Sequence, residues 1–278
     1  MLDRWEGAEP AGWARRLELA AVEFHAQLDS TNRRARELAA EGIPVPALVL
    51  ADRQKAGRGR QGRTWESDHP GGLWVSLVEA GGPSAALLPL VAGLAVLRAA
   101  AELLGEPCGG TLTLKWPNDV YAQGAKMAGV LCEALGDQVV VGIGVNVNQI
   151  LEDLPVGLAV APTSLRHLKG APVARGELLQ AVVGHWRELR KTLQKDEVDK
   201  EGPRLPSDLV AELNDRSAVL GRSVAVRGTA RHSNGRLGPV DDDGATGGRI
   251  LPDGALSYEW AGRTSVLIAG SVRILGHR

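Results

Sequence analysis

Arginine and glycine alternate in the most unusual segment of the chain, residues 57–65 (GRGRQGRTW). Guanidinium groups bind phosphate and carboxylate oxygens in a forked geometry, and glycines let backbone N–H groups approach a ligand. The segment therefore predicts an anion-binding loop that is mobile when empty and is ordered by its ligand. A basic solvated hairpin loop and an RNA-binding tract are the alternatives. RNA binding is disfavoured, because the motif occurs once and the chain holds only 7 Trp, 2 Tyr and 1 Phe.

Two lysines stand beside residues that form turns. Lys115 precedes residues 116–119 (WPND), and Lys126 precedes an apolar run. Taken alone, the first segment reads as an ordinary turn and the second lysine as a solvated charge at a strand edge. A lysine beside an Asn/Asp pair can also neutralise phosphate and help to hold Mg²⁺. In a hairpin both ammonium groups would converge on one end of the sheet.

Residues 142–148 (GIGVNVN) form a predicted strand that carries two glycines. Glycine weakens a strand and often marks the close approach of a ligand or of another backbone. Asn146 and Asn148 share one face and can hydrogen-bond a polar ligand, although a bulged strand with a polar outer face explains them equally well. The segment is not a dinucleotide-binding fingerprint, because Val147 stands where the last glycine of that motif belongs.

The elements that must position these segments predict a mixed α+β domain. Apolar runs predict strands at residues 22–27, 47–51, 73–78, 111–116, 127–135 and 139–147. Helical spacing predicts helices after residue 30, over 84–104 and over 177–193. The last three strands are joined by short turns, so we expect antiparallel neighbours in a largely antiparallel sheet.

A second, smaller unit follows. Residues 196–206 are charged and contain proline, which is typical of a connector. A short helix and several β-like runs separated by glycine-rich turns come next, and they predict a small β-barrel. We therefore divide the chain into residues 1–206 and 207–278. Residues 241–248 are expected to form a mobile loop, since they have nothing to bury.

Composition limits the function classes. The 32 basic and 33 acidic side chains nearly cancel, so nothing global favours nucleic acid or a membrane as a partner. Two cysteines provide neither a disulfide framework nor zinc-ligand spacing. The N-terminus lacks the apolar segment of a signal peptide, and the apolar run at 85–97 is too short to span a bilayer. We predict a cytoplasmic protein.

Five segments in a fixed order carry a resemblance. They are residues 30–32 (STN), Gln54 with the 57–65 loop, and residues 115–119 (KWPND), 126–131 (KMAGVL) and 142–148 (GIGVNVN). This ordered set resembles the bacterial biotin–protein ligases. The resemblance implies a class II synthetase-like, lipoate-ligase-like catalytic domain, followed by an SH3-like barrel. It implies that ATP activates biotin to biotinyl-5'-AMP and that the biotin passes to a lysine of a biotin carboxyl carrier protein.

The resemblance also implies roles for individual residues. Biotin would be held by Ser30, Thr31, Asn32, Gln54, Arg58, Gly59, Arg60, Lys126, Gly129 and Gly144. ATP would be held by Arg60, Trp65, Lys115, Asn118, Asp119 and Asn148. The catalytic set would be Arg58, Arg60, Lys126 and Asp119, and Asp119 would also be a ligand of Mg²⁺.

Two departures from the family pattern matter. Only 29 residues precede Ser30, too few for the DNA-binding helix-turn-helix of the bifunctional members, so we expect no repressor activity and no DNA partner. Ala125 stands where many members have an arginine, which removes one phosphate contact. A lipoate or octanoate ligase is the nearest rival and is disfavoured by the Gly/Arg loop. An exposed sheet edge makes a homodimer conceivable. The whole interpretation requires Arg58, Lys115 and Lys126 to share one cleft.

Overall fold

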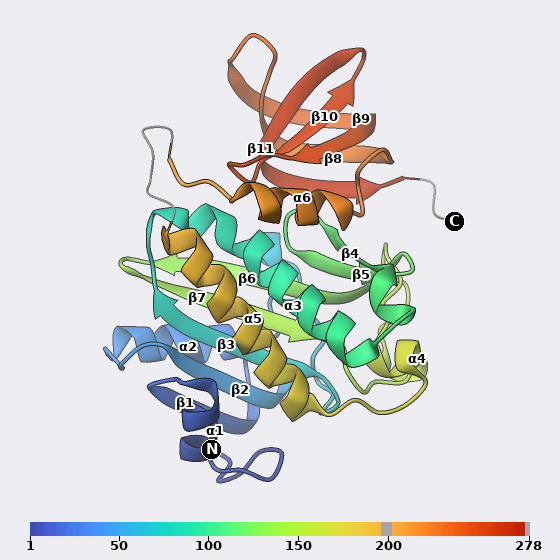
Figure 1. The fold of residues 1–278 in the computed structure, drawn as a ribbon. Coiled ribbons are helices and arrows are strands. Elements are labelled where there is room, and N and C mark those ends of the chain that lie inside the picture. Colours follow the sequence, from blue (N-terminus) through green and yellow to red (C-terminus); the bar gives the residue numbers. More distant parts are fainter. Residues whose placement is uncertain (196–201, 276–278) are drawn as a thin grey trace.

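A computed structural model describes residues 1–195 and 202–275, and its centre is one seven-stranded mixed sheet (Figure 1). The strands are β1 (Ala21–Leu28), β2 (Ala47–Gln54), β3 (Leu73–Ala80), β4 (Leu112–Lys115), β5 (Asp119–Ala122), β6 (Ala125–Leu135) and β7 (Gln138–Val145). Their spatial order is β1-β2-β3-β7-β6-β5-β4. Only the β1–β2 pair is parallel among these strands, which confirms the predicted largely antiparallel sheet.

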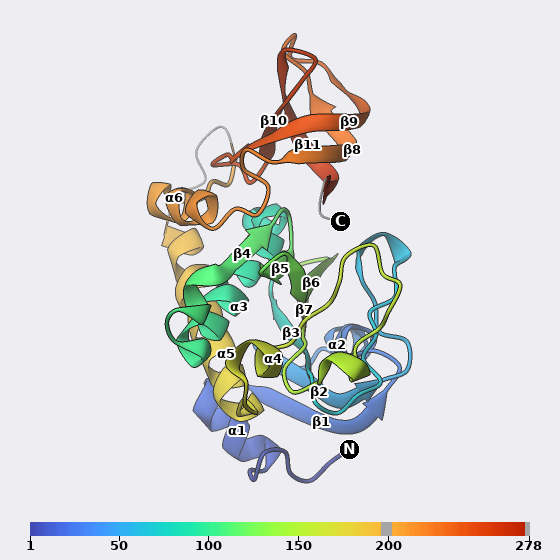
Figure 2. The same cartoon turned by 90° about the vertical axis from the view of Figure 1, so that its right-hand side faces the viewer.

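Helices cover both faces of this sheet. The helices are α1 (Pro10–Leu17), α2 (Thr31–Ala40), α3 (Leu88–Leu104), α4 (Leu165–Lys169), α5 (Arg175–Lys195) and α6 (Ser207–Asp215). Short 3₁₀ turns lie at Arg60–Gly62, Pro83–Leu87, Cys108–Thr111 and Leu151–Asp153. Helices α3 and α5 pack on one face and α2 on the other (Figures 1 and 2). Two apolar clusters result, a large one under α3 and α5 and a small one under α2.

Helix α3 is apolar on nearly every face because it lies between the sheet and α5. By length and composition, the stretch 84–104 is long and apolar enough to cross a membrane, but 67% of its most apolar window is buried inside the protein. The helix begins with Pro89 in its first turn and ends at Gly105, whose φ of +67° suits glycine. The predicted helix is present. Its apolar stretch is longer than the predicted run 85–97, so it is burial, and not a short length, that marks it as a core helix.

The C-terminal strands close into a barrel. They are β8 (Ser223–Arg231), β9 (Leu237–Ile250), β10 (Leu256–Trp260) and β11 (Arg263–Ile274), ordered β10-β11-β8-β9. Small and branched apolar side chains such as Val226, Ala245 and Leu256 fill the interior. The predicted barrel is therefore present. The domain boundary at residue 206 stays a prediction, and part of the predicted connector, residues 196–201, lies outside the described residues.

The prediction of a mobile loop at residues 241–248 is wrong, because these residues belong to strand β9. Asp241 forms an ion pair with Arg227 on β8, with 2.7 Å between Arg227 Nε and Asp241 Oδ1. The Tyr258 hydroxyl donates a hydrogen bond to Asp242 Oδ2 at 2.8 Å. Ala245, between the acidic residues and the glycines, is fully buried. The acidic run thus finds partners across the barrel, which the sequence pattern alone does not reveal.

The barrel is attached to the main sheet through β4, the strand at one edge of that sheet. Leu114 N donates to Arg216 O at 2.7 Å, and Ala218 N donates to Leu114 O at 2.9 Å. Trp116 Nε1 donates to Gly254 O at 2.9 Å. Helix α6 lies between the barrel and the main sheet in Figure 1. This edge of the sheet is therefore partly covered. At the other edge, Leu2 N donates to Phe24 O of β1 at 2.7 Å.

Candidate active site

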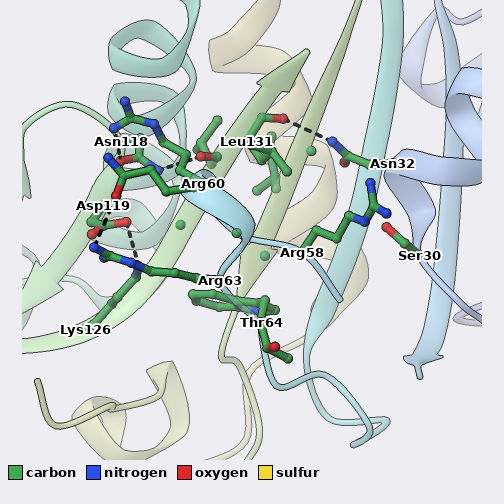
Figure 3. A pocket seen from close by; sticks show the side chains of 18 of the residues that line it. Ser30, Asn32, Arg58, Arg60, Arg63, Thr64, Asn118, Asp119, Lys126 and Leu131 are labelled. Carbon is green, nitrogen blue, oxygen red and sulfur yellow. Dashed lines mark hydrogen bonds and ion pairs between the residues drawn. The ribbon is translucent and has the colours of Figure 1, made fainter. Parts of the chain in front are cut away.

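The sequence-predicted segments meet at one solvent-open cavity of about 120 Å³. It is lined by Ser30, Thr31, Asn32, Gln54, residues 58–61 and 63–65, Lys115, residues 117–119, Lys126, residues 129–131, residues 142–144 and Ser271. Arg58, Lys115 and Lys126 come from different elements and all face this space, so the required common cleft exists. In Figure 3 the Arg58 side chain points toward Ser30, at the opposite end of the cavity from Lys126.

The floor of the cavity is a cross-strand glycine pair. Gly129 on β6 lies opposite Gly144 on β7. The Trp65 indole packs on both: a Cβ at Gly144 would lie 2.7 Å from Trp65 Nε1, and one at Gly129 would lie 3.2 Å from its Cζ3. Lys126 Nζ lies 5.1 Å from the centre of the same ring, a cation–π contact. The glycines are therefore needed to admit an aromatic side chain of the Gly/Arg loop.

A chain of polar side chains forms the wall that is predicted to hold biotin. Thr31 donates to Gln54 Oε1 through its backbone N at 2.7 Å and through Oγ1 at 3.1 Å. Gln54 Nε2 donates to Ser67 Oγ at 3.1 Å. Ser76 Oγ lies 2.8 Å from Thr31 Oγ1 and 2.7 Å from Asn32 Oδ1. Neither Ser67 nor Ser76 stands in a motif, so sequence reasoning misses both.

Asn32 explains the first glycine of the 142–148 segment. A Cβ at Gly142 would lie 1.8 Å from Asn32 Oδ1, so only glycine fits under this amide. Asn32 Nδ2 donates to Glu133 Oε2 at 2.8 Å and to Leu131 O at 3.3 Å (Figure 3). The amide is fixed from both ends, which preorganises this wall of the cavity.

Asp119 sits between two lysines. Its carboxylate lies 2.6 Å from Lys126 Nζ and 3.4 Å from Lys115 Nζ, and the three residues come from β5, β6 and β4. Burial lowers the pKa of Lys115 below the ordinary lysine value, and the nearby Asp119 charge only partly offsets this effect. Among the described residues that line the cavity, Asp119 carries the one carboxylate. The predicted convergence of both ammonium groups is confirmed, although a short strand, β5, separates the lysines.

The Gly/Arg loop is folded back across the cavity. Gly57 allows the turn, since a Cβ there would lie 2.3 Å from Trp65 O. Gly59 N donates to Arg63 O at 2.7 Å. At the tip, Arg60 donates to Asn118 Oδ1 at 3.3 Å and to Gly270 O of the barrel at 3.1 Å. Burial of this guanidinium lowers its pKa. Whether the loop is mobile when empty stays a prediction.

The two asparagines of the 142–148 segment lie outside the set that lines the cavity. Asn146 Nδ2 donates to Thr163 O at 3.0 Å. Asn148 exchanges two hydrogen bonds of 2.8 Å with the backbone of Val173. Both amides therefore hold the segment that follows β7. The role predicted for Asn148 in ATP binding has no support from its position.

Several lining residues are absent from the sequence prediction. Arg63 and Thr64 belong to the tract that the prediction singled out, but no role was given to them. Leu131 and Ile143 are apolar wall residues that look like any other strand residue. Ser271 lies far along the chain, and no motif marks it.

The arrangement can bring two anions together. Five cationic side chains, Arg58, Arg60, Arg63, Lys115 and Lys126, border a cavity whose walls also offer hydroxyl and amide groups and the Asp119 carboxylate. Such groups offset the repulsion between a carboxylate and a phosphate and stabilise charge on a transferring phosphoryl centre. Within residues 1–195 and 202–275, no group of three or more His, Cys, Asp and Glu is arranged to hold a metal ion.

Comparison with known proteins agrees with this geometry. Residues 24–148 match the model of the Biotin/lipoate A/B protein ligase family. The chain is 33% identical to the "Biotin--[acetyl-CoA-carboxylase] ligase" of Mycobacterium tuberculosis, over 94% of this chain and 90% of that protein. It is similar to a solved structure titled "Biotin protein ligase from Aquifex aeolicus in complex with biotin and ATP", with a TM-score of 0.71, 29% identity and coverage of 91% and 98%.

Other relatives are longer. The match to the "Bifunctional ligase/repressor BirA" of Bacillus subtilis, at 36% identity, covers 58% of this chain and 50% of that protein. The chain thus spans about half the length of such bifunctional relatives.

Proposed function

Because the chain belongs to the biotin–protein ligases of the biotin/lipoate A/B protein ligase family, we propose that it activates biotin with ATP and transfers it to a lysine of a biotin carboxyl carrier protein. The observation that carries the proposal is the convergence of Arg58, Lys115 and Lys126 on one cavity. The names of the Mycobacterium relative and of the Aquifex structure support biotin, ATP and a carboxylase acceptor.

In the first step a biotin carboxylate oxygen attacks the α-phosphorus of ATP. A bond forms between that oxygen and phosphorus, the bond to the bridging oxygen breaks, and pyrophosphate leaves. The reaction needs two anions in contact, so we assign Lys126 to the carboxylate side. Arg58, at the opposite end of the cavity, is assigned to the loop that closes over biotin. Lys115 and Arg60 are assigned to the phosphate side. The polar wall of Thr31, Asn32 and Gln54 would hold the biotin ring system.

In the second step the acceptor amine attacks the carbonyl carbon of biotinyl-AMP. An amide bond forms, AMP leaves, and the amine gives up a proton. Asp119 is the carboxylate at hand, and we assign it to orienting the amine or accepting its proton. Both of its oxygens are engaged by lysines. Binding of phosphate to those lysines would free the carboxylate for this task.

Mg²⁺ is expected with ATP, and its fit to this site is partial. Mg²⁺ prefers six oxygen ligands and often keeps water and substrate phosphates among them. Asp119 would supply one oxygen, and the remaining ligands would be phosphate oxygens and water. The ion would neutralise charge on the phosphates.

A cytoplasmic location and the lack of a DNA partner stay predictions. A homodimer through strand pairing also stays a prediction.

One exchange assay tests the proposal. The full chain is incubated with ATP and labelled pyrophosphate, and the return of label into ATP is measured with biotin, with lipoate and with RNA. We expect exchange with biotin alone. Exchange with lipoate would instead favour the lipoate ligases that share the family, and no exchange with any of the three would exclude adenylate formation.

A further inference from the structure

The barrel contributes directly to the cavity. Among the described residues that line it, Ser271 on β11 is the one that comes from the C-terminal barrel. The residue before it, Gly270, accepts a hydrogen bond from Arg60 Nη2 at 3.1 Å. The loop tip and the barrel are therefore in direct contact at the mouth of the cavity, although 210 residues separate the two partners.

Arg60 is held from two sides. Its Nη1 donates to Asn118 Oδ1 at 3.3 Å, and Asn118 in turn donates through Nδ2 to Val130 O at 2.6 Å. The amide is thus anchored to strand β6. A half-buried guanidinium is costly unless its donors find acceptors. The Gly270 carbonyl supplies an acceptor on the barrel side, and Asn118 supplies one on the sheet side.

The backbone around Gly270 has an unusual shape. Gly270 pairs with Gly228 on β8, and both have φ of +148°. A Cβ at Gly270 would lie 2.1 Å from Arg227 O, and one at Gly228 would lie 2.0 Å from Ala269 O. The register of the β8–β11 pairing shifts between Leu267 and Ala269, just before the Gly228–Gly270 pair. Such irregularities bend a strand and re-aim its groups.

We propose that Gly270 is a positioning residue: its carbonyl oxygen on β11 holds the Arg60 guanidinium over the cavity, so the barrel sets how long the loop stays closed on the adenylate. The Gly228–Gly270 crossing gives β11 the shape that aims this carbonyl at the loop. The kinetic part of the inference rests on the proposed function. The physical contact between Arg60 and the barrel does not.

The kinetic test is a double-mutant cycle on the full chain. Biotinyl-AMP is formed on the enzyme, and its release is followed for the wild type, Gly270→Ala, Arg60→Met and the double variant. Loss of a hydrogen bond to a charged group should speed release about tenfold in Gly270→Ala. In the Arg60→Met background the same substitution should change release by less than about twofold. An equal effect in both backgrounds would overturn the proposal, because Gly270 would then act independently of Arg60.

Gly262→Ala is the matched control for backbone strain. Gly262 lies in the β10–β11 turn with φ of +71°, and a Cβ there would meet nothing within 4 Å. The control should lower stability and leave the release rate near that of the wild type. If it accelerates release as much as Gly270→Ala, general weakening of the barrel explains the result and the proposal fails.

A second measurement needs neither a glycine variant nor activity. Hydrogen exchange of the amides at residues 269–272 is compared in the wild type, Arg60→Met and Arg63→Met. Arg63 is the matched control, because its guanidinium donates to Gln61 within the loop at 3.2 Å. Exchange should increase in Arg60→Met alone. Unchanged exchange in Arg60→Met would show that Arg60 does not hold the Gly270 carbonyl, and the proposal would fail. If the wild type forms no adenylate, the proposed function is refuted, but the hydrogen-exchange measurement still tests the contact between Arg60 and the barrel.

Discussion

The Arg60 side chain, at the tip of the Gly/Arg loop, hydrogen-bonds to Asn118 on the side of the main sheet and to Gly270 on the barrel. Arg60→Ala removes both of its hydrogen bonds, each of them made by a charged donor. We expect biotinyl-AMP to leave the enzyme about 100-fold faster or more, because such bonds contribute roughly 1.5–3 kcal/mol each and two of them are lost. Release of labelled adenylate, chased with unlabelled biotin and ATP, measures this. Retention equal to the wild type would contradict the closing role of the loop.

The lowered pKa of Lys115 predicts that the use of ATP depends on pH. Burial lowers its pKa, so its ammonium loses its proton at a lower pH than an ordinary lysine. The charged form binds phosphate, and kcat/KM for ATP should therefore fall as the pH rises through this lowered pKa. In Lys115→Arg the fall should move to higher pH, because arginine stays protonated. The exposed Lys191→Arg is the control and should keep the wild-type profile. Identical profiles for all three proteins would exclude Lys115 as the titrating group.

Asp119 is predicted to act on the acceptor amine. Asp119→Asn keeps the shape and removes the charge between Lys115 and Lys126. Transfer of biotin from preformed adenylate to the carrier protein should slow by about 10²-fold or more, the usual contribution of a general base. Asp137→Asn, in the exposed turn before β7, should leave transfer unchanged. Full-speed transfer by Asp119→Asn in single-turnover measurements would remove this role.

At the scale of elements, the glycine pair on β6 and β7 determines where Trp65 lies. A methyl group at Gly144 would come within 2.7 Å of the indole nitrogen, so Gly144→Ala must displace the ring. We expect weaker biotin binding and a loss of stability of about 1–3 kcal/mol, which is typical of overpacking. Titration by calorimetry and urea unfolding measure the two effects.

Gly184→Ala is the control for Gly144→Ala. Gly184 lies in helix α5, and an added methyl group there would meet nothing within 4 Å, so its replacement should stabilise the protein slightly and spare biotin binding. Wild-type affinity in Gly144→Ala would show that the indole position does not matter for the ligand.

Motif residues were predictable because their types are rare in their local setting. The Gly/Arg tract and the lysines beside WPND stand out in the sequence, and the structure brings them to one cavity. Asn146 and Asn148 were ambiguous, since an amide on a strand can face a ligand or a neighbouring backbone, and only tertiary structure decides. The hydroxyl of Ser76 gives no signal, because nothing in sequence distinguishes a serine under a cavity from one in an ordinary core.

Long-range pairing limited the prediction of elements. Strand β5 is only Asp119–Ala122, and its first residues also fit a turn, so the sequence suggested one turn where the structure has a strand. The acidic residues of β9 looked unable to bury anything, because their partners Arg227 and Tyr258 lie on other strands. Helix α1 was missed as well. It is only eight residues long, and its buried face consists of Trp13 and Leu17.

For the whole molecule, the attachment of the barrel predicts cooperative unfolding. The hydrogen bond from Trp116 Nε1 to Gly254 O lies at the junction, next to the backbone pairing of β4. Trp116→Phe should lower the free energy of unfolding by about 1 kcal/mol. It should also increase hydrogen exchange in the turn around residue 254. Urea unfolding and exchange mass spectrometry measure these changes.

Trp260→Phe serves as the comparison for Trp116→Phe, because this indole is 45% exposed and lies on the barrel away from the junction. It should leave hydrogen exchange around residue 254 unchanged. The main sheet and the barrel should still unfold at the same urea concentration. If both variants behave alike, the junction does not couple the barrel to the sheet.

The distance along the chain between Arg60 and Gly270 has a consequence for biosynthesis. A ribosome completes all seven strands of the main sheet before it adds β11, so the carbonyl that accepts the Arg60 hydrogen bond is made last of the parts that surround the loop. With the role proposed for Gly270, retention of the intermediate depends on a strand that is synthesised after every strand of the catalytic sheet.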